Sequence, residues 1–257
     1  MATLASYQAL AAGPTGSVSE RTDPLPSALR MRTDGQLAVY YAPFEYVNPQ
    51  ARLVLVGITP GRQQAVNALL AYRSALASGH TCEAALALAK DEASFSGPMR
   101  SNLVGLLDYL GVQRWLGLES CASLFQADTG LVHFTSALRY PIFANGQNYS
   151  GRSPGITRHA LLRSELEHWL PEELAPMDAP LVVPLGGAVE QALDFLADRG
   201  RIEHVQLLRG LPHPSGANAE RLSYFMERKS RAACSDKVNT AKLDRARAEA
   251  RRTVDRL

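Results

Sequence analysis

A continuous apolar run at residues 51–57 constrains most strongly how this chain can fold. The run reads ARLVLVG, without the alternation of apolar and polar residues that marks a strand with one face in water. It therefore predicts a strand that is buried on both faces. Residues 180–187 (PLVVPLGG) form a second run of this kind, which also ends in glycine. Such strands belong to sheets that are covered by helices, so we expect an α/β protein.

Strands and helices are predicted to alternate along the rest of the chain. Further strands are expected at residues 36–41, 131–138 and 204–208, and helices at 103–110, 159–170 and 188–197, with two more within 62–90. Because helices usually connect parallel strands, we expect a three-layer α/β/α fold around a mostly parallel central sheet. The expected divisions are an irregular lead-in at 1–30, one core domain at 31–225 and a basic helical extension at 226–257.

The composition is that of a globular protein. The 257 residues are 46% hydrophobic, which is enough to form a full core. Cys82, Cys121 and Cys234 are far apart and lack C-x-x-C spacing, so we expect neither disulfides nor a metal site. No apolar stretch approaches the roughly 18 residues of a membrane span, and the N-terminus lacks the pattern of a signal peptide. A cytoplasmic monomer without membrane contact is the expectation.

Positive charge is concentrated at the C-terminal end of the sequence. The formal net charge is +2, but residues 219–257 carry eleven Lys or Arg against six Asp or Glu. A basic segment can neutralise the phosphates of a nucleic acid, and it can equally be a solvated helix face. The sequence leaves both alternatives open.

Two loops rich in glycine and proline follow predicted strands. Residues 57–61 (GITPG) follow the first buried run, and residues 211–218 (LPHPSGAN) follow the strand at 204–208. Loops of this kind let the backbone approach a ligand closely while a polar side chain is held in a fixed direction. The pair predicts a ligand site built on strand ends.

These two motifs, in this order, resemble those of the uracil-DNA glycosylase superfamily. Its members carry a G-x-[D/N/A]-P-[Y/G] loop after the first core strand and an H/N-P-S loop after the last. The segments FSGP at 95–98, TS at 135–136 and LGG at 185–187 also resemble elements of that family, and the similarity covers roughly residues 39–225. The resemblance implies an enzyme that rotates a base out of double-stranded DNA and needs no metal or cofactor.

The resemblance also implies roles for individual residues. His213 would donate a hydrogen bond to the base as it departs with negative charge, unless it makes only a structural bond. Thr59 aligns with the Asp or Asn that positions the attacking water in other branches, and its hydroxyl can orient water but cannot be a general base near neutral pH. Thr59 could instead merely close the turn. The other implied loop residues are Gly57, Ile58, Pro60 and Gly61 for the substrate, and Pro214, Ser215, Gly216, Ala217 and Asn218 for DNA.

Base recognition departs from that of uracil-specific members. Ser136 stands where they carry an asparagine whose amide reads uracil, and one hydroxyl cannot make both of those hydrogen bonds. Phe95 is the expected stacking platform, with Tyr72 as its competitor; if Phe95 stacks, residues 63–94 form an insertion beside the pocket. Asn145, Asn148 and Tyr149 could bind a modified base or be ordinary turn residues, and Arg139 and Arg152 could bind phosphates or simply face solvent.

The expected function is therefore that of a monofunctional DNA glycosylase that acts on a pyrimidine other than plain uracil. The leading hypothesis for the substrate is a hypermodified or glucosylated cytosine of phage DNA. Such a substrate would imply a role in antiviral defence. The alternatives are a repair glycosylase for uracil, mismatched thymine or oxidised pyrimidines, and a DNA-binding protein that has lost the chemistry.

Overall fold

The computed structural model describes residues 3–13, 24–94, 98–126 and 130–257. The chain divides into two compact units that alternate along the sequence, so the units do not follow the expected boundaries at 30 and 225. Unit 1 consists of Met1–Val47, Gly57–Ser94 and Phe134–Ala175, and unit 2 of Asn48–Val56, Phe95–His133 and Pro176–Leu257.

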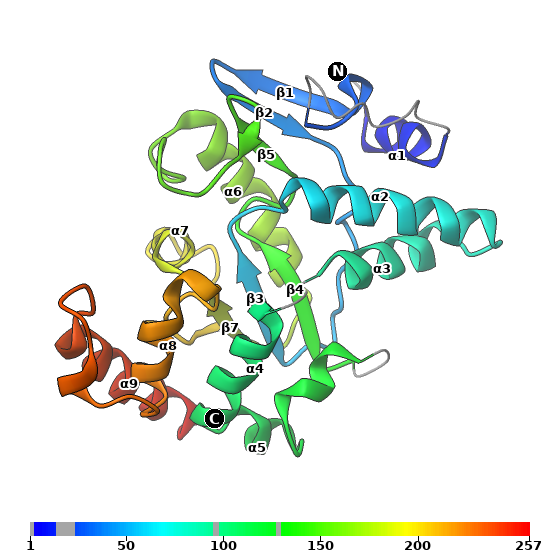
Figure 1. Cartoon of the computed structure of the whole chain (residues 1–257). Coiled ribbons are helices and arrows are strands. Elements are labelled where there is room, and N and C mark those ends of the chain that lie inside the picture. Colours follow the sequence, from blue (N-terminus) through cyan, green and yellow to red (C-terminus); the bar gives the residue numbers. More distant parts are fainter. Residues whose placement is uncertain (1–2, 14–23, 95–97, 127–129) are drawn as a thin grey trace. The chain divides into compact units, whose positions relative to one another are not determined.

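Unit 1 contains an antiparallel sheet and four helices (Figure 1). Its elements are α1 (Leu4–Ala12), β1 (Arg30–Asp34), β2 (Leu37–Tyr40), α2 (Arg62–Ala77), α3 (Cys82–Ala93), β5 (Ile142–Ala144), β6 (Gln147–Asn148) and α6 (Ala160–Leu174), with a short 3-10 turn at Ser27–Leu29. The helical pair expected within 62–90 is confirmed by α2 and α3. The expected irregular lead-in is wrong for Leu4–Ala12, because α1 forms there with Thr3 as its N-cap.

The antiparallel sheet corrects the expectation of one mostly parallel sheet. Its strand order is β1-β2-β5-β6. The turn between β5 and β6 consists of Asn145 and Gly146, with φ of 50° and 75°, and two residues with positive φ are what a tight hairpin of this kind requires. The strand expected at residues 36–41 is confirmed as β2, whereas β1 (RMRTD) carries mostly exposed polar side chains and β5 and β6 are only three and two residues long.

A buried group of charges lies within unit 1. The carboxylate of Glu173 binds two cations, with Lys90 Nζ at 2.5 Å from Oε1 and Arg139 Nε at 2.9 Å from Oε2. Lys90 also donates to the carbonyl of Tyr46, and all three charged side chains are buried. Burial lowers the pKa of Lys90, and the adjacent Glu173 opposes that shift. Glu173 is therefore the group that compensates both buried cations.

We predict that Glu173→Gln strongly destabilises the protein, because it removes the buried carboxylate that contacts both Lys90 and Arg139. The expected loss is about 3–5 kcal/mol in the free energy of unfolding, measured by urea denaturation. Glu172→Gln is the matched control, since the neighbouring carboxylate is largely exposed and its one ion pair with a described residue is to exposed His168. Equal effects of the two substitutions would contradict the assigned role of Glu173.

Unit 2 is built on the parallel sheet, whose strand order is β4-β3-β7-β8 (Figure 1). Its elements are β3 (Leu53–Gly57), α4 (Pro98–Leu110), α5 (Val112–Leu116), β4 (Val132–Ser136), β7 (Leu181–Pro184), α7 (Gly187–Ala197), β8 (Gln206–Leu207), α8 (Ala219–Phe225) and α9 (Thr240–Val254), with 3-10 turns at Cys121–Phe125, Gly216–Asn218 and Arg231–Ala233. The last residue of β3 and the last three residues of β4 belong to unit 1.

The two apolar runs of the sequence form neighbouring strands of this sheet. β3 and β7 pair in parallel, from Leu53 opposite Leu181 to Val56 opposite Pro184, and these residues are buried. The prediction of an α/β protein with buried parallel strands is thereby confirmed. No helix in the described part of the chain combines the length and apolarity that a membrane crossing requires.

Candidate active site

The loop that carries His213 is fixed at its start within unit 2. Gly210 has φ of +79°, and its N–H donates to Glu190 Oε2 of α7 at 2.8 Å. A Cβ added to Gly210 would lie 2.7 Å from Cβ of Ala246 on α9. The backbone conformation and the close approach of α9 both require glycine at this position.

The His213 side chain lies against the end of β7. Gly186, which follows this strand, has φ of +98°, and a Cβ there would lie 3.0 Å from Cδ2 of the imidazole. On the other side of the loop, Asn102 Nδ2 of α4 donates to the carbonyl of Pro214 at 2.8 Å. His213 is thus held at the carboxyl end of a strand of the parallel sheet, where α/β proteins commonly bind ligands.

The environment of His213 favours a neutral imidazole with its proton on Nε2. The N–H of Ser215 donates to Nδ1 at 3.2 Å, so Nδ1 acts as the acceptor. Burial lowers the pKa of His213 below its ordinary value. Nε2–H then remains as a hydrogen-bond donor, and no described residue accepts a bond from it.

The rest of this loop combines exposed backbone with anchored polar side chains. Gly216 and Ala217 are exposed, whereas Pro214 is buried. Asn218 Nδ2 lies 3.3 Å from Ser215 Oγ, and Asn218 Oδ1 accepts from Arg221 at 2.8 Å. Sequence reasoning did not connect Arg221 with this loop, because no helix was expected at residues 218–221, where α8 (Ala219–Phe225) lies.

The 57–61 loop lies in unit 1, where Thr59 is tied to the chain that follows β4. Its hydroxyl donates to the carbonyl of Tyr140 at 2.8 Å and accepts from the N–H of Ile142 at 3.1 Å. The carbonyls of Gly57 and Ile58 accept from the N–H groups of Ala137 and Leu138. The hydroxyl of Thr59 keeps one lone pair for a further donor, such as water.

A carboxyl group near this segment was also missed by sequence reasoning. Tyr140 binds Thr59 through its carbonyl, and its hydroxyl donates to Glu45 Oε1 at 3.1 Å. Burial raises the pKa of Glu45 above its ordinary value. Glu45 lies outside regular secondary structure and belongs to no motif, so nothing in the sequence indicated it.

The three further base-binding candidates occupy different surroundings. Asn148 contacts the 57–61 loop: its Oδ1 accepts from the N–H of Arg62 at 2.9 Å, and its side chain borders Gly61. Asn145 is exposed in the hairpin turn and donates to Gln36 Oε1 at 3.0 Å. Tyr149 is buried, and its hydroxyl donates to the carbonyl of Pro154.

The structure describes all of the remaining predicted residues except Phe95. Phe95 lies outside the described residues, and Tyr72 is buried with its hydroxyl 3.3 Å from Cys82 Sγ. Ser136 is half-buried at the end of β4, and Arg152 is exposed. The suggestion that Arg139 binds phosphate is wrong, because its guanidinium is buried against Glu173.

The two loops belong to different units, so their union in one site stays a prediction. Within the described chain, no group of three or more His, Cys, Asp or Glu side chains is arranged to hold a metal ion.

Comparison with known proteins identifies a relative in a bacterium. The chain is 36% identical over 211 residues to the uncharacterized protein YoxB of Bacillus subtilis (strain 168), across 81% of this chain and 82% of the relative. The chain belongs to the YoxB family. No family model and no solved structure matches it. Since YoxB is itself uncharacterized, membership of the YoxB family assigns no activity, and a function must be argued from the residues.

We predict that Gly186→Ala displaces the His213 imidazole, because the new methyl group would meet Cδ2 and the positive φ disfavours alanine. The measurement is the change in the His213 ring signals by NMR. Gly187→Ala is the matched control, since nothing lies within 4 Å of a Cβ at that helical position. Unchanged His213 signals in Gly186→Ala would refute the contact.

We also predict a pH dependence of stability that originates at His213. Its pKa is lowered in the folded state, so the unfolded chain binds the proton more tightly. The contribution is fully present above the unfolded pKa of about 6.5 and is lost as the pH falls through the lowered folded value. Urea unfolding of wild type and His213→Gln across this range should show a steeper loss for wild type, and parallel curves would contradict the shift.

Proposed function

We propose that this chain is a DNA glycosylase that hydrolyses the N-glycosidic bond of a flipped, modified pyrimidine and leaves an abasic site. The observation that carries the proposal is His213, a neutral imidazole that is oriented by Ser215 and supported by Gly186 at the end of β7. Two independent features, the motif order in the sequence and this geometry, agree on a donor at that position.

The chemistry explains why such a donor would be useful. When the bond between the base and C1′ breaks, its electron pair leaves with the base, and positive charge develops on the sugar. A fixed Nε2–H donor near a pyrimidine oxygen stabilises the departing anion most in the transition state. Water then adds to C1′, and the proton that it loses is balanced by protonation of the departed base anion, directly or through solvent. A neutral donor is suitable because it needs no buried cation.

The topology of the parallel sheet supports a ligand site at the same edge. β3 lies between β4 and β7, and β8 follows β7, so the chain proceeds in opposite directions across the sheet from β3. In open α/β sheets, ligands bind outside the carboxyl ends of the strands at such a switch point. The strand β7, whose end contacts His213, is one of the two strands at that point.

The residues also favour a substrate other than uracil. Thr59 has its hydroxyl hydrogen directed to Tyr140, so catalysis would depend on leaving-group stabilisation while Thr59 orients water. Ser136 cannot replace an asparagine amide in reading uracil. We therefore propose a hypermodified cytosine, such as a glucosylated base of phage DNA, as the substrate and antiviral defence as the role.

The test is the release of bases from DNA, with abasic sites detected by alkaline cleavage and the freed base identified by mass. We expect product from phage DNA that contains modified cytosine and none from unmodified DNA. Product only from uracil, mismatched or oxidised DNA would indicate a repair enzyme instead. Absence of product from every DNA would refute the enzyme assignment.

We predict that His213→Ala reduces the rate of base release by about 100-fold or more, in line with the removal of one transition-state donor. DNA binding, measured by fluorescence anisotropy, should change little. Gly187→Ala serves as the control with an unperturbed imidazole. Equal losses of binding and rate in His213→Ala would contradict a catalytic role.

A further inference from the structure

The helix α9 has one buried apolar face and one exposed charged face. Its apolar side chains Leu243, Ala250 and Val254 are buried. The opposite side carries Lys242, Arg245, Glu249 and Arg252, and Arg256 follows in the turn after the helix; these residues are spaced by three or four positions, and all five are exposed. At this spacing the four helical side chains lie on one side of the helix, and Arg256 lies just beyond its end. We call them the basic stripe.

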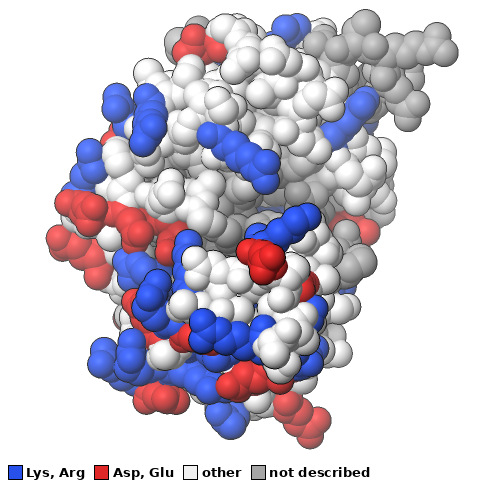
Figure 2. Space-filling view, turned by 60° about the vertical axis from the view of Figure 1, so that its left-hand side comes forward, with Lys and Arg blue, Asp and Glu red and all other residues white. Residues whose placement is uncertain are grey.

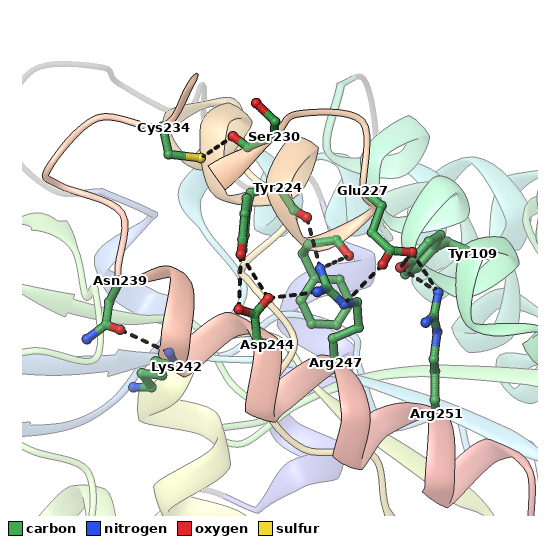
Figure 3. A network of polar contacts seen from close by, with 11 residues as sticks. Tyr109, Tyr224, Glu227, Ser230, Cys234, Asn239, Lys242, Asp244, Arg247 and Arg251 are labelled. Carbon is green, nitrogen blue, oxygen red and sulfur yellow. Dashed lines mark hydrogen bonds and ion pairs between the residues drawn. The ribbon is translucent and has the colours of Figure 1, made fainter. Parts of the chain in front are cut away.

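Cations on the inner side of α9 are paired, as Figure 3 shows. Arg247 Nη2 lies 2.7 Å from Asp244 Oδ1, and Arg251 Nη2 lies 3.0 Å from Glu227 Oε2. Glu227 also accepts a hydrogen bond from the hydroxyl of Tyr109 on α4, which lowers the pKa of its carboxyl group together with Arg251. These contacts stabilise the packing of α9 on unit 2.

Cations of the basic stripe have no such partners. None of Lys242, Arg245, Arg252 and Arg256 makes an ion pair with a described residue, and Glu249 is the single acid among them. In the lower part of Figure 2, many Lys and Arg side chains are exposed, with Asp and Glu side chains among them. The stripe thus has a surplus of three positive charges and faces solvent.

We propose that the basic stripe of α9 binds the phosphate backbone of double-stranded DNA, independently of sequence. From residue 242 to residue 252 the helix rises by about 15 Å, a length over which one strand of B-DNA presents about four phosphates. A line of separated cations on a rigid helix is complementary to such a regular polyanion. The choice of DNA as the polyanion rests on the proposed glycosylase function.

The same helix is poorly suited to a membrane surface. Amphipathic helices that bind lipid insert an apolar face between the headgroups. In α9 the apolar face is buried in unit 2, and the small residues Ala241 and Ala248 are the apolar members of its exposed surface. The stripe can therefore offer charge but little apolar area.

The test measures the affinity for a short unmodified duplex as a function of salt concentration. Each neutralised phosphate contributes about 0.9 to the slope of log affinity against log salt. Replacing Lys242, Arg245, Arg252 and Arg256 together by Gln should therefore reduce that slope by about 3.6. The control carries Gln at four exposed cations outside α9, namely Arg114, Arg163, Arg199 and Arg231, and should change the slope by less than about 1.

A second variant is expected to raise the affinity for DNA and not to lower it. It keeps the proposal testable if the fourfold variant does not fold. Glu249→Gln removes the single acid, so it should tighten duplex binding at low salt. Equal slopes for the stripe and control variants, no tightening by Glu249→Gln, or stripe-dependent binding to anionic phospholipid vesicles without an effect on duplex DNA would each overturn the proposal.

The outcome is separable from that of the proposed function. Base release without a stripe-dependent slope would refute the stripe alone. A stripe-dependent slope without base release from any DNA would refute the glycosylase and leave the stripe as a DNA-binding surface.

Discussion

The parallel pairing of β3 with β7 is the constraint on which the candidate site in unit 2 depends. Both strands are buried on both faces, and the ladder continues past Pro184, where the N–H of Leu185 donates to the carbonyl of Val56. This pairing fixes the position of Gly186, and Gly186 leaves room for the imidazole of His213. The orientation of a polar group is thus determined by apolar strands that make no contact with a ligand themselves.

The sequence predicted those parts of the fold that bury long apolar runs. β3, β7 and the α2–α3 pair could be inferred because their hydrophobic patterns extend over whole elements. In the antiparallel sheet of unit 1, β2 could be inferred, but the pairing of the sheet could not, because β1 is exposed and β6 consists of only two residues. Local composition also gave no indication that the segments of the two units alternate along the chain.

For the candidate site, the sequence indicated residues that lie in motifs but not their partners from distant segments. A neutral His213 donor was predicted from motif and chemistry and stays a prediction; its Nδ1 accepts the N–H of Ser215. The role of Arg139 could not be derived, because a sequence does not reveal that Glu173, 34 positions away, will form an ion pair with it. Glu45 was missed for the same reason, since its hydrogen bond with Tyr140 joins segments that are distant in sequence.

The close approach of Gly210 to Ala246 has a consequence for the order of folding. The loop with His213 follows β8, yet its first residue packs against a helix that begins thirty positions later, at Thr240. A nascent chain that has emerged only as far as α8 contains every strand of the parallel sheet but cannot complete this packing. The imidazole therefore acquires its final support late in synthesis, after the strands that define its position have been made.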